Sequence, residues 1–225
     1  MVASADVTFT SSAPPPTEVA IDVFGAAQSA GGSKTATKSI TTKDPGEIVV
    51  AYFAGPYTLT AVASTPSLTW TLLETTADPS TDYSAYYAVM PTAGALSVAG
   101  TFATAGTGSE VVLVAVSGGG SVSSAVSATG NGLTPTVPIS TSGAGEMILA
   151  FGSATSSDKS TEAITPGPGY TLVGTASTGG GTSLKDYAVE YQVLSENVTG
   201  LPADFDLAVA SDWAVIAVAI SPLGA

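Results

Sequence analysis

The chain has 225 residues, with five Lys or Arg against eighteen Asp or Glu, so its formal net charge is -13. This acidity argues against nucleic acid as a partner, because binding to phosphates depends on cationic side chains. The sequence has no Cys, His or Arg, which excludes disulfides, thiolate metal sites and imidazole acid/base chemistry.

Two further features bear on location. No apolar stretch approaches the about 20 residues that a membrane-spanning helix needs, so no membrane insertion is expected. The N-terminus lacks the basic start and apolar core of a secretory signal, although the charge-poor, Ser- and Thr-rich composition is typical of exported proteins. Either a signal has been removed from a secreted or cell-surface protein, or the chain leaves the cell without secretion, as a virion does on lysis.

Residues 1–17 precede the rest of the pattern as a separate segment. They contain a strand-like run, Val7–Thr10, in which Val7 and Phe9 share one face, followed by the prolines Pro14–Pro16. Three prolines favour an extended spacer. The segment is interpreted either as a disordered leader or as an extended arm that adds a strand to a neighbour's sheet, with Val7 and Phe9 as interface candidates.

From residue 18 onward, short β-type runs alternate with Gly, Pro, Asp and Ser, and helical periodicity is absent. The run IVVAYFA is apolar at successive positions, as in central strands that are covered on both faces. The first half predicts strands at Glu18–Phe24, Thr35–Thr41, Glu47–Ala54, Trp70–Glu74, Tyr83–Met90, Leu96–Phe102 and Val111–Ser117.

The second half repeats the first. Ala26–Gly55 corresponds to Ala125–Ser153, and the same register aligns Tyr87 with Tyr191 near the middle of each half. A repeat of about a hundred residues is a whole small domain duplicated. The second half predicts strands at Ser121–Ala128, Leu133–Ser140, Glu146–Gly152, Tyr170–Gly174, Asp186–Leu194, Phe205–Ala210 and Trp213–Ile220.

Seven antiparallel strands per half predict an all-β chain of two tandem β-sandwiches, jelly-roll or Ig-like, behind the N-terminal arm. The expected domains are residues 18–118 and 119–225. The boundary lies in Gly118–Ser121, whose three glycines predict a flexible but short joint. The two sandwiches are therefore expected to touch.

Aromatic residues without a counterpart in the other half are candidates for contact with a partner. Tyr86 is one, because its counterpart is Glu190; it is either a lone exposed aromatic or an interface or sugar-stacking residue. Trp213 is either a contact residue or a core residue at the start of a strand. Tyr57 lies in the loop Pro56–Thr65, which has no match in the second half.

Acidic residues offer weak candidates for a metal site. Asp204 and Asp206 would share one face of a strand, and Asp212 could approach from the following turn, so that their oxygens could bind calcium or imitate a glycosidase pair. A solvated acidic face is the alternative. Glu47 and Glu146 are repeated immediately before a central strand, where hydrogen bonds to backbone amides at the turn explain them.

Catalysis is not expected. Serines are abundant, but the chain has no histidine to activate them and no Gly-x-Ser-x-Gly elbow. It also has no glycine-rich nucleotide-binding loop, so no cofactor is expected. The sequence thus predicts an architecture more firmly than an activity.

The succession GEIVVAYFAG, TPSLTWTLL, YSAYYAVMPTAG and VVLVAVSG resembles a type of sandwich domain found in phage particle proteins and bacterial surface proteins. The resemblance implies an accessory structural protein of a tailed-phage virion, such as a capsid decoration protein or a tail component. Other virion proteins and further copies of the chain would then be its partners. The alternatives are a carbohydrate-binding or adhesive surface module, with a glycan as ligand, and a self-assembling extracellular filament or surface-layer subunit.

Overall fold

The computed structural model describes residues 18–29, 31–106, 108–156, 163–179 and 184–224. This part of the chain forms sixteen β-strands and no α-helix, which confirms the predicted all-β class. It accordingly contains no helix with the length and hydrophobicity needed to cross a membrane. The proposed arm, with Val7 and Phe9, lies outside the described residues.

The first half forms two antiparallel sheets. Five strands pair in the order β1-β8-β3-β6-β5, and three pair in the order β2-β7-β4. The strands are β1 (Ala20–Gln28), β2 (Ser33–Thr42), β3 (Glu47–Gly55), β4 (Leu59–Thr65), β5 (Thr71–Asp78), β6 (Thr81–Met90), β7 (Gly94–Gly106) and β8 (Glu110–Ser117).

The second half repeats this topology strand for strand. Its five-stranded sheet has the order β13-β14-β11-β16-β9. Each strand in it is the counterpart of the strand numbered eight lower in the first half, and the neighbours are the same. Its three-stranded sheet, β10-β15-β12, follows the same rule. The strands are β9 (Gly119–Gly132), β10 (Thr136–Ile139), β11 (Met147–Ser156), β12 (Ile164–Pro166), β13 (Thr171–Gly179), β14 (Leu184–Val193), β15 (Leu201–Leu207) and β16 (Ser211–Pro222).

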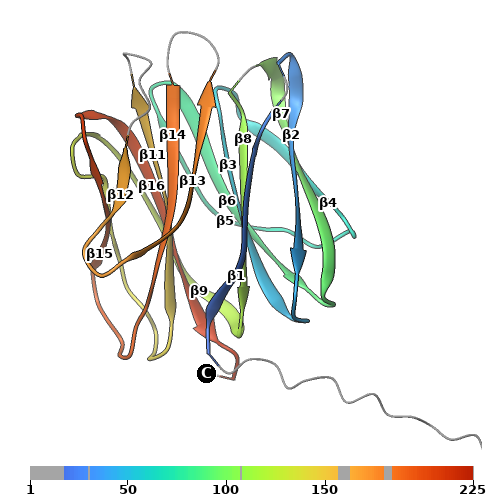
Figure 1. Ribbon diagram of the computed structural model, residues 1–225, viewed down its shortest axis with the longest axis vertical. Helices are drawn as coiled ribbons and strands as arrows, with labels where there is room; N and C mark the ends of the chain where they lie inside the picture. The colour runs from blue at the N-terminus through green and yellow to red at the C-terminus, as the bar shows by residue number, and fades with distance from the viewer. Residues whose placement is uncertain (1–17, 30, 107, 157–162, 180–183, 225) are drawn as a thin grey trace, which may run out of the picture.

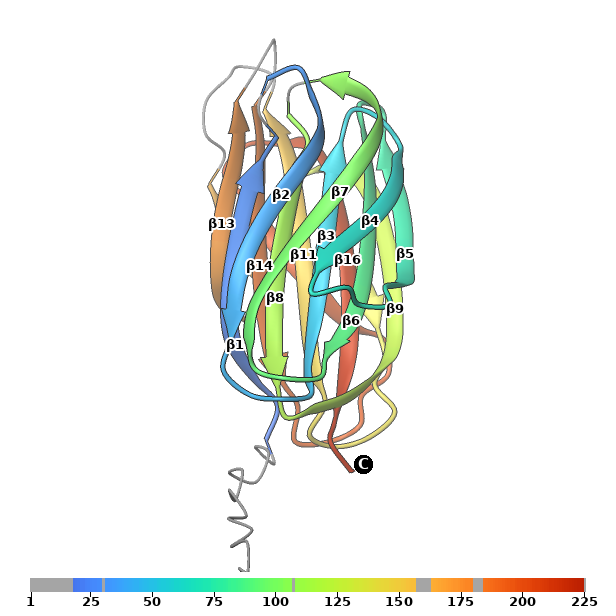
Figure 2. The same cartoon turned by 90° about the vertical axis from the view of Figure 1, so that its right-hand side faces the viewer.

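The two five-stranded sheets pack face to face, so the molecule has four layers with the small sheets outside (Figures 1 and 2). Side chains from both halves form one apolar core between these large sheets, separate from the core inside each sandwich. At its centre the rings of Tyr52 and Phe151, which are counterparts in the repeat, stack with centroids 4.9 Å apart. Strands β3 and β8 are buried along their whole length, as the apolar run predicted for β3.

The structure differs from the prediction in strand number and at the boundary. Each half has eight strands rather than seven. The additional strands, β4 and β12, lie in segments predicted as loops, because they are short edge strands with little apolar alternation. Strand β15 begins at Leu201 rather than Phe205. The glycines after β8 are not a flexible joint, because β9 already starts at Gly119. A Cβ on Gly119 would lie 2.9 Å from the Ile220 side chain, so close packing requires glycine there.

At one equivalent place in both sandwich cores a phenylalanine packs against a glycine, and the two copies carry that phenylalanine on opposite sheets. In the first copy Phe53 of β3 lies against Gly100 of β7, where an added Cβ would meet the ring at 2.5 Å. In the second copy Gly152 of β11 lies against Phe205 of β15, at 2.6 Å. Strand pairing shows that these are equivalent positions. The same space in each core is therefore filled by one phenylalanine ring. The ring comes from the large sheet in the first copy and from the small sheet in the second.

Candidate functional site

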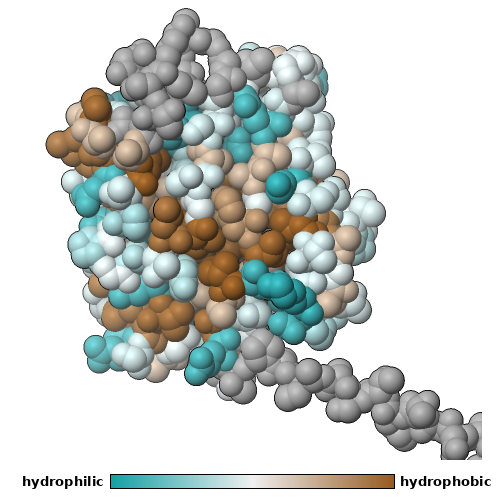
Figure 3. Space-filling view, in the orientation of Figure 1, coloured by the Kyte–Doolittle hydropathy of each residue, from teal (hydrophilic) through white to brown (hydrophobic). Residues whose placement is uncertain are grey.

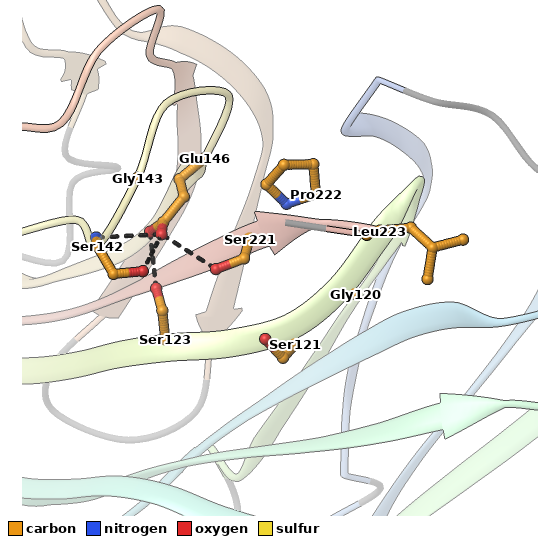
Figure 4. A pocket seen from close by; sticks show the side chains of 10 residues that line it. Gly120, Ser121, Ser123, Ser142, Gly143, Glu146, Ser221, Pro222 and Leu223 are labelled. Atoms are coloured by element: carbon orange, nitrogen blue, oxygen red, sulfur yellow. Dashed lines mark hydrogen bonds between the residues drawn. The ribbon is translucent and has the colours of Figure 1, made fainter.

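A hollow of about 480 Å³ lies at the end of the molecule where β8 leads into β9. It is lined by the start of β9, the turn between β10 and β11, and the end of β16. Ser123, Ser142 and Ser221 come from these three elements, and all point toward the carboxylate of Glu146 (Figure 4). We call this hollow the Glu146 pocket.

Glu146 is almost completely buried, yet it is fully hydrogen-bonded. The Ser123 hydroxyl donates to Oε2 at 2.7 Å, and the Ser221 hydroxyl donates to Oε1 at 3.0 Å. Ser142 donates to Oε1 through both its backbone N–H, at 3.1 Å, and its hydroxyl. Burial raises the pKa of Glu146, but the hydrogen bonds from Ser142, Ser123 and Ser221 outweigh it and hold this pKa below its ordinary value. The carboxylate is therefore charged and engaged at neutral pH.

The first copy has the same arrangement with other side chains. The backbone N–H groups of Lys43 and Asp44 donate to Glu47 Oε1 at 3.1 and 2.8 Å, which confirms the turn interpretation. Asp22, in a β-bulge that corresponds to the bulge at Ser123, forms an ion pair with Lys43 beside Glu47. Burial, with a further contribution from Asp22, raises the pKa of Glu47 to about 7.

A glutamate that accepts hydrogen bonds from the same turn in both copies indicates a role in the fold. In the Glu146 pocket the serine hydroxyls donate to the carboxylate, so none of them is poised as a nucleophile. Among the residues that the structure describes, no group of three or more His, Cys, Asp or Glu side chains is placed to hold a metal ion. The chemistry that the pocket offers is hydrogen bonding to a small polar ligand.

The three aspartates proposed from the sequence do not converge. Ala203 and Phe205 of β15 point into the core of the second sandwich, so Asp204 and Asp206 share the opposite, outward face. Burial, together with the charge of Asp206, raises the pKa of Asp204. Asp212, on β16, instead accepts a hydrogen bond from Asn131 at 2.8 Å.

The unmatched aromatic residues are mostly internal. Tyr86 packs into the core of the first sandwich, edge-on to Phe53 with centroids 6.1 Å apart. The face carrying Tyr86 is thus the inside of a sandwich, because both faces of the large sheet are covered. Trp213 is buried in the core of the second sandwich. Tyr57, with 38 % of its surface exposed, remains open to a partner.

Sequence reasoning missed a set of buried ionisable residues. Glu110 and Glu190 are buried with one oxygen unpartnered among the described residues, and burial raises the pKa of each to about 8. Asp78 and Lys185 form a buried ion pair that joins the two sandwiches. No local pattern could have found this pair, because its members are far apart in sequence. Alignment of the copies does give one signal for Glu190, which replaces Tyr86 on a core-facing position.

Comparisons with known proteins add no relative. No protein-family model, no curated protein and no solved structure matches the chain. The assignment of a function therefore depends on the residues and geometry described above.

Proposed function

We propose that this chain is a non-enzymatic structural protein of a tailed-phage virion, which decorates and stabilises the capsid or forms part of the tail. The observation that carries the proposal is the core between the two sandwiches. It joins both copies into one block through stacked aromatic rings and β-branched side chains. A duplicated block whose halves share a continuous apolar core suits a protein that works by occupying and bracing a surface.

Exposed apolar residues that recur in both copies support a contact role. Leu72 and its counterpart Leu172 are 51 % and 42 % exposed, and Val89 and Val193 are 47 % and 46 % exposed. Because these side chains are exposed, packing within the fold does not explain why both copies have an apolar residue at each of these positions. Figure 3 shows apolar surface along the middle of one face, over β1 and β13 in Figure 1. Such patches on soluble proteins commonly mark sites of protein contact.

The test is physical association with particles. An antibody raised against the purified chain is used to follow it through density-gradient fractions of a phage lysate from the source organism. We expect the chain to band with intact particles and gold-labelled antibody to mark the head or the tail. A chain found only in the soluble fractions of the gradient would contradict the proposal.

The two alternatives predict other results. A carbohydrate-binding module would bind on a glycan array, although of its three proposed aromatic residues Tyr57 alone is open to a sugar ring. A filament or surface-layer subunit would form large assemblies of the pure chain without particles. Light scattering of the chain alone distinguishes this outcome from particle decoration.

A further inference from the structure

One charged pair is enclosed between the two sandwiches. Asp78 stands at the end of β5 and Lys185 near the start of β14, and Lys185 Nζ lies 3.5 Å from Asp78 Oδ2. The side chains are 1 % and 10 % exposed respectively. The pair thus joins two separate sheets in a place that excludes most water.

The surrounding groups hold both partners in position. The Tyr83 hydroxyl donates to Asp78 Oδ2 at 2.6 Å, while the Ser80 backbone N–H donates to Oδ1 at 2.7 Å. Lys185 Nζ donates to the hydroxyls of Ser80 and Thr155 at 3.1 and 3.0 Å. The amine is therefore fixed beside the carboxyl group, with Nζ 3.5 Å from the oxygen bonded to the carbon that it would attack.

Burial opposes the charge on both members of this pair. Burial holds the pKa of Lys185 below its ordinary value, although Asp78 opposes the shift. For Asp78, burial raises the pKa, but Tyr83, Lys185 and Ser80 outweigh it and keep this pKa low. Two buried charges carry a desolvation cost that their attraction offsets only in part. A reaction that removes both charges at once removes that cost.

We infer that Lys185 and Asp78 condense to an amide, which covalently links the two sandwiches. The Lys185 nitrogen attacks Asp78 Cγ with its lone pair after passing a proton to the carboxylate. Cγ–Oδ2 then breaks, and this oxygen leaves as water with two protons that came from the ammonium. The third ammonium proton stays on the amide nitrogen. No oxidant or cofactor is consumed.

Tyr83 and Ser80 have distinct parts in this reaction. The Tyr83 hydroxyl, on the departing Oδ2, relays protons to it and is a catalytic residue of the step. The Ser80 N–H, on Oδ1, stabilises the negative charge that develops on that oxygen in the tetrahedral intermediate. Because Asp78 starts as a carboxylate, the first proton transfer is uphill, so the link forms slowly after folding.

The chain provides two internal comparisons. In the other half of the repeat, the positions of Asp78 and Lys185 correspond to Thr178 and Thr81, so the link can form only once. The ion pair between Lys43 and Asp22 has the same chemistry, but the Lys43 side chain is 71 % exposed. Water competes at that pair and keeps it ionic. It therefore serves as the matched control.

Mass spectrometry of the purified full chain tests the inference. After prolonged incubation at neutral pH we expect an intact mass below the sequence mass by one water, and a branched peptide containing Asp78 and Lys185. Trypsin should no longer cleave after Lys185 but should still cleave after Lys43. K185R, which keeps the positive charge and cannot form this amide, and D78A should retain their sequence masses. Y83F should lower the rate of water loss at least tenfold.

An intact mass equal to the sequence mass would overturn the inference and leave an ordinary buried ion pair. A water loss that maps to any other residues, or that persists in K185R, would overturn it equally. The inference does not depend on the proposed function, because the link is a property of the isolated chain.

Discussion

The inverted phenylalanine and glycine pairs lead to a quantitative prediction. The second copy places the ring on the small sheet, at Phe205, and the glycine on the large sheet, at Gly152. The first copy has the reverse arrangement. We therefore predict that exchanging the two residues, in the double variant G152F/F205G, restores most of the stability that each single substitution removes.

The magnitudes follow from the burial of this ring. Phe205 is fully buried, and removing such a ring costs about 3–5 kcal/mol, to which glycine in a strand adds about 0.5–1 kcal/mol. G152F alone forces a second ring into a filled space, at a cost of about 1–3 kcal/mol or more. In the double variant one ring fills the space again. We expect it to lie within about 2 kcal/mol of the wild type, giving a coupling energy of at least about 2.5 kcal/mol.

Urea unfolding of the wild type, both single variants and the double variant completes the cycle. Equal slopes with denaturant would show that the variants unfold from comparable native states. The reasoning is refuted if the double variant is no more stable than F205G. That result would mean that the two copies pack their cores independently and that the inversion compensates nothing.

Two further predictions concern buried carboxyl groups. Glu110 and Glu190, with pKa values raised to about 8, stay protonated in the folded chain while the unfolded chain releases their protons, so stability should fall as pH rises from about 5 to 8. Melting temperatures across this range check it, and E110Q/E190Q should make the fall smaller, with the remainder due to Glu47, whose pKa is raised to about 7. E146A should lose about 2–4 kcal/mol in urea unfolding, because three serines lose their charged acceptor. E47A, the control, should lose less, since Glu47 is held mainly by two backbone amides.

The duplication made most of the fold predictable. Aligning the copies located the strands that carry the cores, because the apolar run of β3 recurs in β11 and the tyrosines of β6 recur in β14. Alternation also showed that Tyr83 and Tyr87 share a buried face. Alternation could not show that this face meets the other sandwich. A period of two tells which residues share a face of a strand, but not which sheet packs against that face. The placement of Tyr86 was misjudged for this reason.

The site was less predictable than the fold. The glutamates before β3 and β11 stood out because they are repeated, and their bonds to turn amides were foreseen. The serines around Glu146 were not, because they come together from three distant elements and Ser123 and Ser142 have no counterpart of the same type in the first copy. The contact between Asp78 and Lys185 depends on how the sandwiches dock. Pairing across a docked interface leaves no local pattern in the sequence.

The shared core between the large sheets has a consequence for synthesis of the chain. The first sandwich can close once Ser117 has left the ribosome, but its inner face, with Val50 and Tyr52, has no cover until β16 follows about a hundred residues later. At about 5–20 residues per second this delay is on the order of 5–20 s. During that time the nascent chain exposes a broad apolar sheet to other polypeptides. Its yield should therefore depend on how fast the second half is translated and on chaperones that shield the first.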